Sequence, residues 1–221
     1  MDVNGKMKIR GAVFDLDGTL LNSLPVWETL PEDYLRSLGI EPKENLNEIF
    51  RDFSTEEAAA YYRRHCGVTL PKEEILSGIH RRLQRDYEER IPAMEGAAAF
   101  LACLKEQGIP MCVATLTDRD LALAALQRTG LAPFFREVLS DSGKGKGDPG
   151  IFLAAAKCLG TEPGETLVFE DSLYALHTAK TAGFITCGVG PRTGSGDIPK
   201  DADLWIDGFS DPAAFLCRVL R

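Results

Sequence analysis

The sequence predicts an α/β protein in which helices cover both faces of a parallel β-sheet. Two observations support this prediction. From residue 91 onward, short apolar runs alternate with helix-like segments, which is the pattern of a parallel sheet with helical connections. Residues 24–90 differ, because they are rich in charge and carry apolar residues at helical spacing. We therefore expect a helical domain inserted after the first strand.

The elements can be predicted in chain order. The first strand should lie within residues 8–15, KIRGAVFD. Acidic residues near the start of two later segments favour helix initiation, and the inserted helices are expected at 27–40, 54–68 and 71–90. The remaining strands are expected at 109–115, 136–140, 165–170, 184–189 and 203–207. Helices should alternate with them, several ending in glycine, at 97–108, 120–130, 148–160, 172–183 and 211–220.

Composition narrows the classes of function. The chain has 221 residues, 44% of them hydrophobic, which is ample for a buried core. A net charge of -8 argues against nucleic acid as a partner, since binding it needs a broad basic surface. No apolar run approaches 18 residues and the N-terminus has no apolar signal region, so we expect no membrane association and a cytoplasmic location. A monomer is the default expectation.

Polar residues follow three of the predicted strands at the point where each strand ends. Asp15 and Asp17 follow the first strand, Thr115 ends the second, and Glu170 with Asp171 ends the strand at 165–170. Ligands in open α/β sheets bind at the carboxyl ends of the strands. Residues i and i+2 of an extended chain point the same way, so the two aspartates should share one side. We expect these groups to converge on one edge, joined by a lysine from the segment GKGKG before the helix at 148–160.

The chemistry of this set is that of a cation and a phosphate. Clustered carboxylates repel one another unless a cation lies among them. Oxygen ligands without histidine or cysteine suit Mg²⁺. A bound Mg²⁺, a lysine and a hydroxyl together can stabilise a phosphate dianion, and a nearby aspartate can attack phosphorus.

Four motifs in order give the sequence a family resemblance. Asp15-Leu16-Asp17-Gly18-Thr19 matches D-x-D-G-T, and Thr115 matches the Ser or Thr that follows an apolar strand. Residues 146–152, KGDPGIF, match K-P-x-P-x-x-F, with glycine where proline is usual, and residues 170–172, EDS, match the acid pair. With these motifs the chain resembles the haloacid dehalogenase superfamily, over essentially its whole length.

The resemblance implies a Rossmann-like core, residues 1–23 and 91–221, with a helical cap domain at 24–90. Asp15 would be the nucleophile and Asp17 the acid and base. Mg²⁺ would be held by the site residues Asp15, Asp17 (through its backbone carbonyl), Asp171 and Glu170. Phosphate would be bound by Thr115 and Lys146, although Lys144 could replace Lys146 if the loop register is shifted.

The function expected from this resemblance is a Mg²⁺-dependent phosphatase that acts on a small phosphorylated metabolite through an aspartyl-phosphate. A sugar phosphomutase like β-phosphoglucomutase is the alternative. Relatives of that enzyme carry a cap histidine twelve residues after the nucleophile, where this chain has Trp27, which favours water as the acceptor. A non-catalytic phosphate-ligand binder is a further alternative, but binding alone does not need both Asp15 and Asp17.

Several candidate residues have a simpler structural interpretation. Asp171 could cap the helix that follows it, and Glu170 could only support the neighbouring acid. Thr115 could merely end a strand, and Lys146 could be a solvated loop lysine. In the cap, Trp27, Arg51 and Phe53 are candidates for substrate specificity, and for Arg51 a solvated helix charge is an equal alternative.

Overall fold

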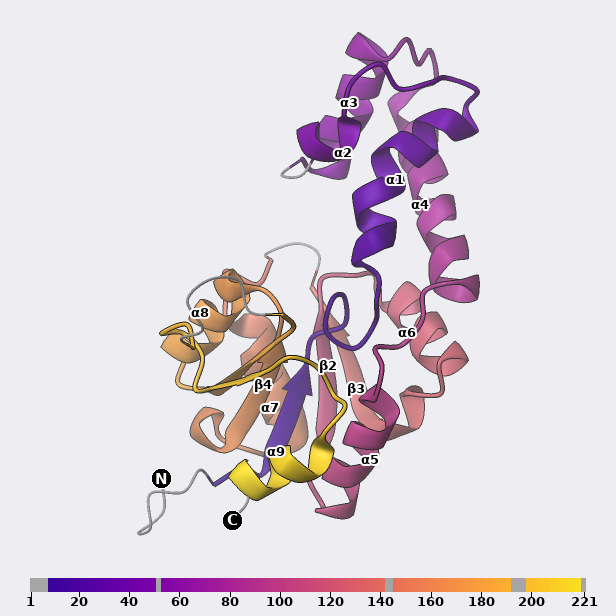
Figure 1. Ribbon diagram of the computed structural model, residues 1–221. Coiled ribbons are helices and arrows are strands. Elements are labelled where there is room, and N and C mark those ends of the chain that lie inside the picture. Colours follow the sequence, from indigo (N-terminus) through magenta and orange to yellow (C-terminus); the bar gives the residue numbers. More distant parts are fainter. Residues whose placement is uncertain (1–7, 51–52, 142–144, 192–197, 220–221) are drawn as a thin grey trace. The chain divides into compact units, whose positions relative to one another are not determined.

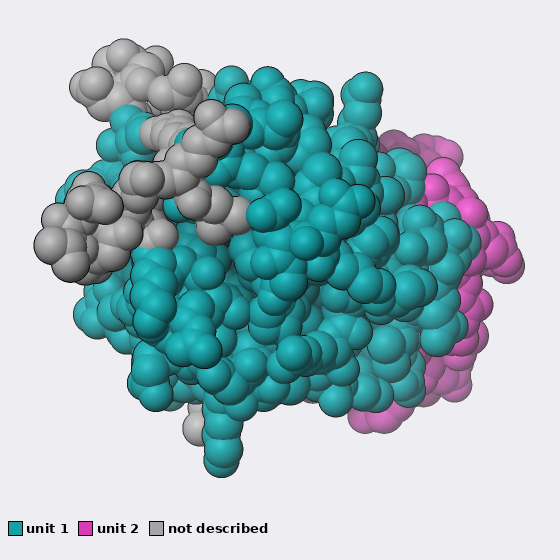
Figure 2. Space-filling view, turned by 90° about the horizontal axis from the view of Figure 1, so that it is seen from below, with its two compact units in different colours: residues 1–22, 92–221 teal, residues 23–91 magenta. Residues whose placement is uncertain are grey.

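The computed structural model describes residues 8–50, 53–141, 145–191 and 198–219 (Figure 1). The chain divides into two compact units, one of residues 1–22 and 92–221 and one of residues 23–91, coloured separately in Figure 2. The first unit contains the β-sheet, and the second consists of helices and their connections.

A parallel sheet of six strands forms the centre of the first unit. In the described residues its order is β3-β2-β1-β4-β5-β6, and every neighbouring pair is parallel. The first strand therefore lies in the middle, between the second and fourth. The strands are β1 (Gly11–Phe14), β2 (Met111–Thr115), β3 (Phe135–Ser140), β4 (Thr166–Glu170), β5 (Ile185–Val189) and β6 (Leu204–Ile206).

Helices cover both faces of this sheet because alternate strand residues point to opposite sides. On one face, Val13 and Val168 pack in a buried cluster with apolar residues of α7 (Gly150–Leu159) and α8 (Leu173–Thr181). On the other, the Phe14 and Phe169 rings stack at 4.3 Å and meet aromatic rings of α5 (Ala97–Glu106) and α9 (Pro212–Val219). The strand connections also include α6 (Arg119–Arg128), η1 (Ala132–Phe134) and η2 (Pro163–Glu165).

The second unit owes its helices to apolar spacing and to caps. Its helices are α1 (Leu24–Ser37), α2 (Leu46–Ile49), α3 (Thr55–His65) and α4 (Lys72–Glu89). The start of α3 has a capping box, in which Ser54 and Glu57 satisfy each other's backbone N–H groups. One stripe of α4 is buried at helical spacing, formed by Ile75, Ile79, Leu83 and Tyr87.

The predicted fold class, a parallel α/β core with helices on both faces, is confirmed. The short helix α2 was not predicted, because four residues are too few for a repeating apolar pattern. Residues 8–10 lie before β1, so the first strand is shorter than expected. Within the described residues, no helix combines the length and apolar character needed to cross a membrane.

Candidate active site

The chain turns sharply just beyond β1, and this turn positions the two aspartates. Asp15 continues the strand, since its N–H donates to the Phe169 carbonyl oxygen at 2.9 Å. Gly18 then adopts a φ of 81°, a left-handed conformation that strains residues with a Cβ. Its N–H donates to the Leu21 carbonyl oxygen at 2.9 Å and closes the turn. The carboxyl end of the central strand therefore carries both Asp15 and Asp17.

Asp17 is held by residues that follow the neighbouring strand. The Thr117 hydroxyl donates to Asp17 Oδ2 at 2.5 Å, and the Thr117 N–H donates to Thr115 Oγ1 at 3.0 Å. Ser140, at the end of β3, donates through its hydroxyl to the Thr117 carbonyl oxygen at 2.7 Å. Sequence reasoning gave Thr117 no role of its own. The sequence showed only that Thr117 carries a hydroxyl two residues after Thr115, and this spacing alone does not predict a contact with Asp17.

Lys146 lies in the same cluster of charges. It is 6% exposed, and its Nζ donates to Asp15 Oδ1 and to Glu170 Oε1, the latter at 2.5 Å. The structure therefore places Lys146 against the predicted nucleophile, and the alternative interpretation of Lys146 as a solvated loop lysine is wrong. The alternative phosphate ligand, Lys144, lies outside the described residues.

The acid pair at the end of β4 completes the cluster. Glu170 is buried, and its Oε2 accepts a hydrogen bond from the Ser172 N–H at 3.1 Å. The N-cap residue of α8 is Ser172, so Asp171 does not cap this helix. Carboxylate oxygens of Asp15, Glu170 and Asp171 lie within 4.8 Å of one another. Such spacing allows the three carboxylates to share one ion.

Burial of these acids changes their protonation. Burial raises the pKa of Asp15 to about 7, and the charge of Glu170 adds to this effect while Lys146 opposes it. Burial likewise raises the pKa of Glu170 to about 7 against the influence of Lys146. Burial and Asp15 together raise the pKa of Asp171. For Lys146, burial alone would lower the pKa, but Asp15 and Glu170 outweigh it and raise the pKa.

A divalent cation fits this arrangement. Three clustered carboxylates face one ammonium, so the cluster carries excess negative charge. Asp15 Oδ2 is buried and accepts no hydrogen bond from the described residues, a costly state for a carboxylate oxygen. All the side-chain ligands available are oxygens, which Mg²⁺ prefers. The residues present are therefore suited to hold such an ion.

The cap candidates lie in the second unit. Trp27 is 38% exposed, and its Nε1 donates to the Tyr87 hydroxyl at 3.0 Å. Phe53 is 40% exposed and stacks on Phe50, with ring centroids 5.2 Å apart. Both aromatic side chains thus keep an accessible face. Arg51 lies outside the described residues.

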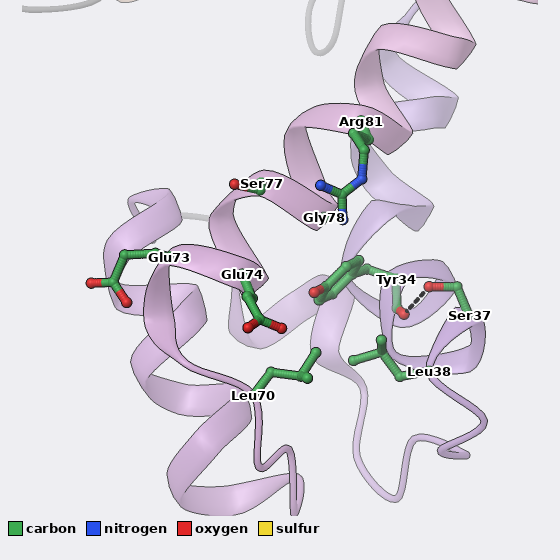
Figure 3. Close-up of a pocket in the computed structure, with 9 residues that line it drawn as sticks. All are labelled: Tyr34, Ser37, Leu38, Leu70, Glu73, Glu74, Ser77, Gly78 and Arg81. Atoms are coloured by element: carbon green, nitrogen blue, oxygen red, sulfur yellow. Dashed lines mark hydrogen bonds between the residues drawn. The ribbon is translucent and has the colours of Figure 1, made fainter.

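The second unit also contains an open cavity of about 440 Å³ beside the helices α1 and α4 (Figure 3). Tyr34 lies in this cavity, close to Gly78, and Ser37 Oγ donates to the Tyr34 carbonyl oxygen at 2.6 Å. Arg81, Glu73 and Glu74 also line it, one positive and two negative side chains. Among the described residues, the acids that come close enough to share an ion are Asp15, Glu170 and Asp171, and the two glutamates of this cavity are not part of such a group.

Comparisons with known proteins find relatives that cover most of the chain. Hexitol phosphatase A of Escherichia coli strain K12 is 30% identical over 197 residues, covering 88% of each chain. A phosphorylated carbohydrates phosphatase of Thermotoga maritima is 27% identical over 177 residues, 79% of this chain and 82% of that protein. A crystal structure of a β-phosphoglucomutase-like protein from Thermotoga maritima superposes with a TM-score of 0.81 at 25% identity, covering 96% of this chain and 100% of the other.

The family assignment rests on the extent of the match. The model of the haloacid dehalogenase-like hydrolases matches residues 9–183, which include the whole second unit, the first unit as far as α8, and all four motifs. The matched relatives include phosphatases, in keeping with a phosphoric monoester hydrolase. The chain belongs to the haloacid dehalogenase-like hydrolase family.

Proposed function

We propose that this protein is a Mg²⁺-dependent phosphatase that hydrolyses a small phosphorylated carbohydrate, such as a hexitol phosphate or sugar phosphate, through a phosphorylated Asp15. The observation that carries this proposal is the buried contact of Lys146 with Asp15 and Glu170, next to Asp171. It gathers a nucleophile, a cation for phosphoryl oxygens and an excess of acid ligands in one place. The names of the relatives support the substrate class.

In the first step, a carboxylate oxygen of Asp15 attacks phosphorus, and the bond from phosphorus to the leaving oxygen breaks. Asp17 donates a proton to that leaving oxygen. In the second step, Asp17 takes a proton from water as the water oxygen attacks phosphorus, which breaks the Asp15–phosphorus bond. Inorganic phosphate leaves, and both aspartates return to their starting states.

The surrounding residues prepare these steps. The Thr117 hydroxyl fixes Asp17 Oδ2, so the acid keeps one orientation through both proton transfers. Lys146 offsets negative charge on Asp15 and on the phosphoryl oxygens, with Thr115 as a further phosphate contact. Mg²⁺ would be held by Asp15, Glu170, Asp171 and the backbone carbonyl of Asp17. When bound, it would supply further positive charge to the phosphoryl group.

A sugar phosphomutase is the second candidate, because a β-phosphoglucomutase-like protein is among the structural neighbours. A mutase must pass the phosphoryl group to a sugar hydroxyl. Trp27 stands at the position of the cap histidine implied by the resemblance, and its indole N–H donates to Tyr87. An indole does not exchange protons near neutral pH, which supports water as the acceptor.

The test is phosphate release from a panel of hexitol phosphates, sugar phosphates, phosphoglycolate and nucleotides, with Mg²⁺ or EDTA. We expect Mg²⁺-dependent release from one or more carbohydrate phosphates, and near-complete loss of it in Asp17→Asn without loss of folding. Conversion of a sugar 1-phosphate in the presence of a bisphosphate, without phosphate release, would identify a mutase. No turnover in either assay would contradict the proposal and favour a binding protein.

A further inference from the structure

Glycine at position 147 departs from the proline that is usual there in the resemblance, and its backbone does not explain the departure. Glycine is required where φ is positive, as at Gly145, whose φ is 71°. Gly147 is not among the glycines with positive φ. The sign of φ therefore does not account for glycine at this position.

The space beside Gly147 is occupied by Tyr174. A Cβ placed on Gly147 would lie 1.9 Å from Tyr174 Oη and 2.8 Å from its Cζ, far inside contact distance. The end of the tyrosine ring occupies the space that a side chain at position 147 would fill. Tyr174 is 67% exposed, so this contact is not part of the apolar core.

The contact joins the two segments that carry the charged cluster. Gly147 follows Lys146 directly, and Tyr174 lies in the first turn of α8, three residues after Asp171. The same segments meet again where Lys146 Nζ donates to Glu170. Tyr174 therefore supports the backbone of the lysine segment while the ion pair engages the end of its side chain.

The lysine segment has little support of its own. Lys146 and Gly147 are the central residues of a turn whose hydrogen bond, from the Asp148 N–H to the Gly145 carbonyl oxygen, is long at 3.4 Å. Asp148 stabilises the next residues, because its Oδ1 accepts from the Gly150 N–H at 2.7 Å. The side of the turn at Gly147 is the side that the Tyr174 hydroxyl contacts.

We propose that Tyr174 is a positioning residue that acts through Gly147 to hold Lys146 in place for the phosphoryl group. This role rests on the proposed function, and it makes positions 147 and 174 interdependent, since a side chain at 147 would displace the Tyr174 hydroxyl from the turn. Lys146 would bind the phosphoryl group, which all phosphate esters share. Loss of Tyr174 should therefore weaken every phosphate ligand by a similar factor.

The experiment is a double-mutant cycle of Tyr174→Ala, Gly147→Ala and the double variant, with Leu173→Ala as the matched control and Tyr174→Phe to isolate the contribution of the hydroxyl. Leu173 is the neighbouring exposed apolar residue, 51% accessible. Dissociation constants for inorganic phosphate are measured by calorimetry with Mg²⁺ present, together with KM, kcat and melting temperature. We expect Tyr174→Ala to weaken phosphate binding and raise KM by roughly three- to tenfold, as a misplaced binding group does, with an unchanged melting temperature.

Gly147→Ala alone should weaken phosphate binding at least as much as Tyr174→Ala, because its Cβ collides with the Tyr174 hydroxyl. The double variant should recover to at least the level of Tyr174→Ala. Leu173→Ala should bind phosphate like the wild type, and Tyr174→Phe, which loses the contacting hydroxyl but keeps the ring, should lie between the wild type and Tyr174→Ala. Unchanged phosphate binding in Tyr174→Ala, or a double variant that binds phosphate more weakly than Tyr174→Ala, would overturn the proposal. Calorimetry needs no turnover, so an inactive wild type would contradict the proposed function and leave this test intact.

Discussion

Two buried acidic centres of the molecule differ in how their charge is balanced. In the second unit, Asp86 is 2% exposed, and each of its carboxylate oxygens accepts from an arginine, Arg82 at 3.2 Å and Arg90 at 3.0 Å. In the first unit, Asp15, Glu170 and Asp171 share one lysine. Asp86 is therefore balanced by two cations from the same helical segment, whereas the other cluster has three carboxylates for one cation. A buried carboxylate therefore indicates a catalytic or metal-binding site only when the cations around it do not balance its charge.

The largest effect that separates the two centres should come from Asp15→Asn. Loss of the proposed nucleophile should lower phosphate release by more than about a thousandfold. The melting temperature should not fall, because the change removes one charge from a cluster with excess acid. Phosphate release and thermal unfolding, measured on the same preparation, test both statements. A clear drop in stability with activity retained would place Asp15 in the same class as Asp86.

The converse variant, Asp86→Asn, should affect stability and spare chemistry. It removes the charge that two arginines share, and hydrogen bonds to charged groups contribute about 1.5–3 kcal/mol each. Because both arginines can be rehydrated, we expect the free energy of unfolding of the second unit to fall by about 2 kcal/mol. Urea denaturation measures this change. The kcat of the folded protein should stay unchanged. A fall in kcat comparable to that of Asp15→Asn would contradict a purely structural role for Asp86.

The charge balance also predicts a pH effect. Burial raises the pKa of Asp15 and of Glu170 to about 7, whereas unfolded acids titrate near about 4. Between these values the folded state binds more protons, so the metal-free protein should lose stability as pH rises from 5 through 7. The raised pKa of Lys146 matters only at strongly alkaline pH, where its contribution is lost.

Melting temperatures in EDTA at pH 5.5 to 8.5 test this prediction, with Asp86→Asn as the matched control. The decline should persist in the control, and Mg²⁺ should raise the melting temperature more at high pH than at low pH. The decline should be shallower in Asp15→Asn. Stability that rises with pH in EDTA over this window would contradict the assigned charge balance.

The smallest effect should come from an exposed ion pair, Arg119 with Glu137, whose atoms lie 2.7 Å apart. Both side chains are about half accessible to water. Glu137→Gln should change the free energy of unfolding by less than about 0.5 kcal/mol, since solvent screens such pairs. Urea denaturation beside Asp86→Asn gives the contrast. An equal loss of unfolding free energy in Glu137→Gln and Asp86→Asn would show that burial does not set the strength of these two ion pairs.

The sequence predicted the fold well because its periodicities were clear. Each predicted strand is present, and strands such as β4 are buried along their whole length, as a sheet with two covered faces requires. The short helix α2 escaped prediction because its helical form depends on a local cap by Asn45. Local caps of this kind leave a weaker pattern than repeated apolar spacing.

The candidate site was predictable wherever a strand end fixed the position. The rule for parallel strands pointed to Asp15, Glu170 and Asp171, which lie together in the structure. Spacing could not choose between Lys144 and Lys146, because a loop has no period. The contacts of Thr117 and Tyr174 could not be predicted from the sequence either, because they form between side chains of separate segments of the chain.

The central claim, that the excess acid beside Lys146 forms a cation site for phosphoryl transfer, is tested most directly by titrating the metal-free protein with Mg²⁺ in a calorimeter. The wild type and Asp86→Asn should each bind one ion per chain. Asp171→Asn should bind it much more weakly while keeping its fold. Absence of binding in the wild type, or equal binding in Asp171→Asn, would contradict the account.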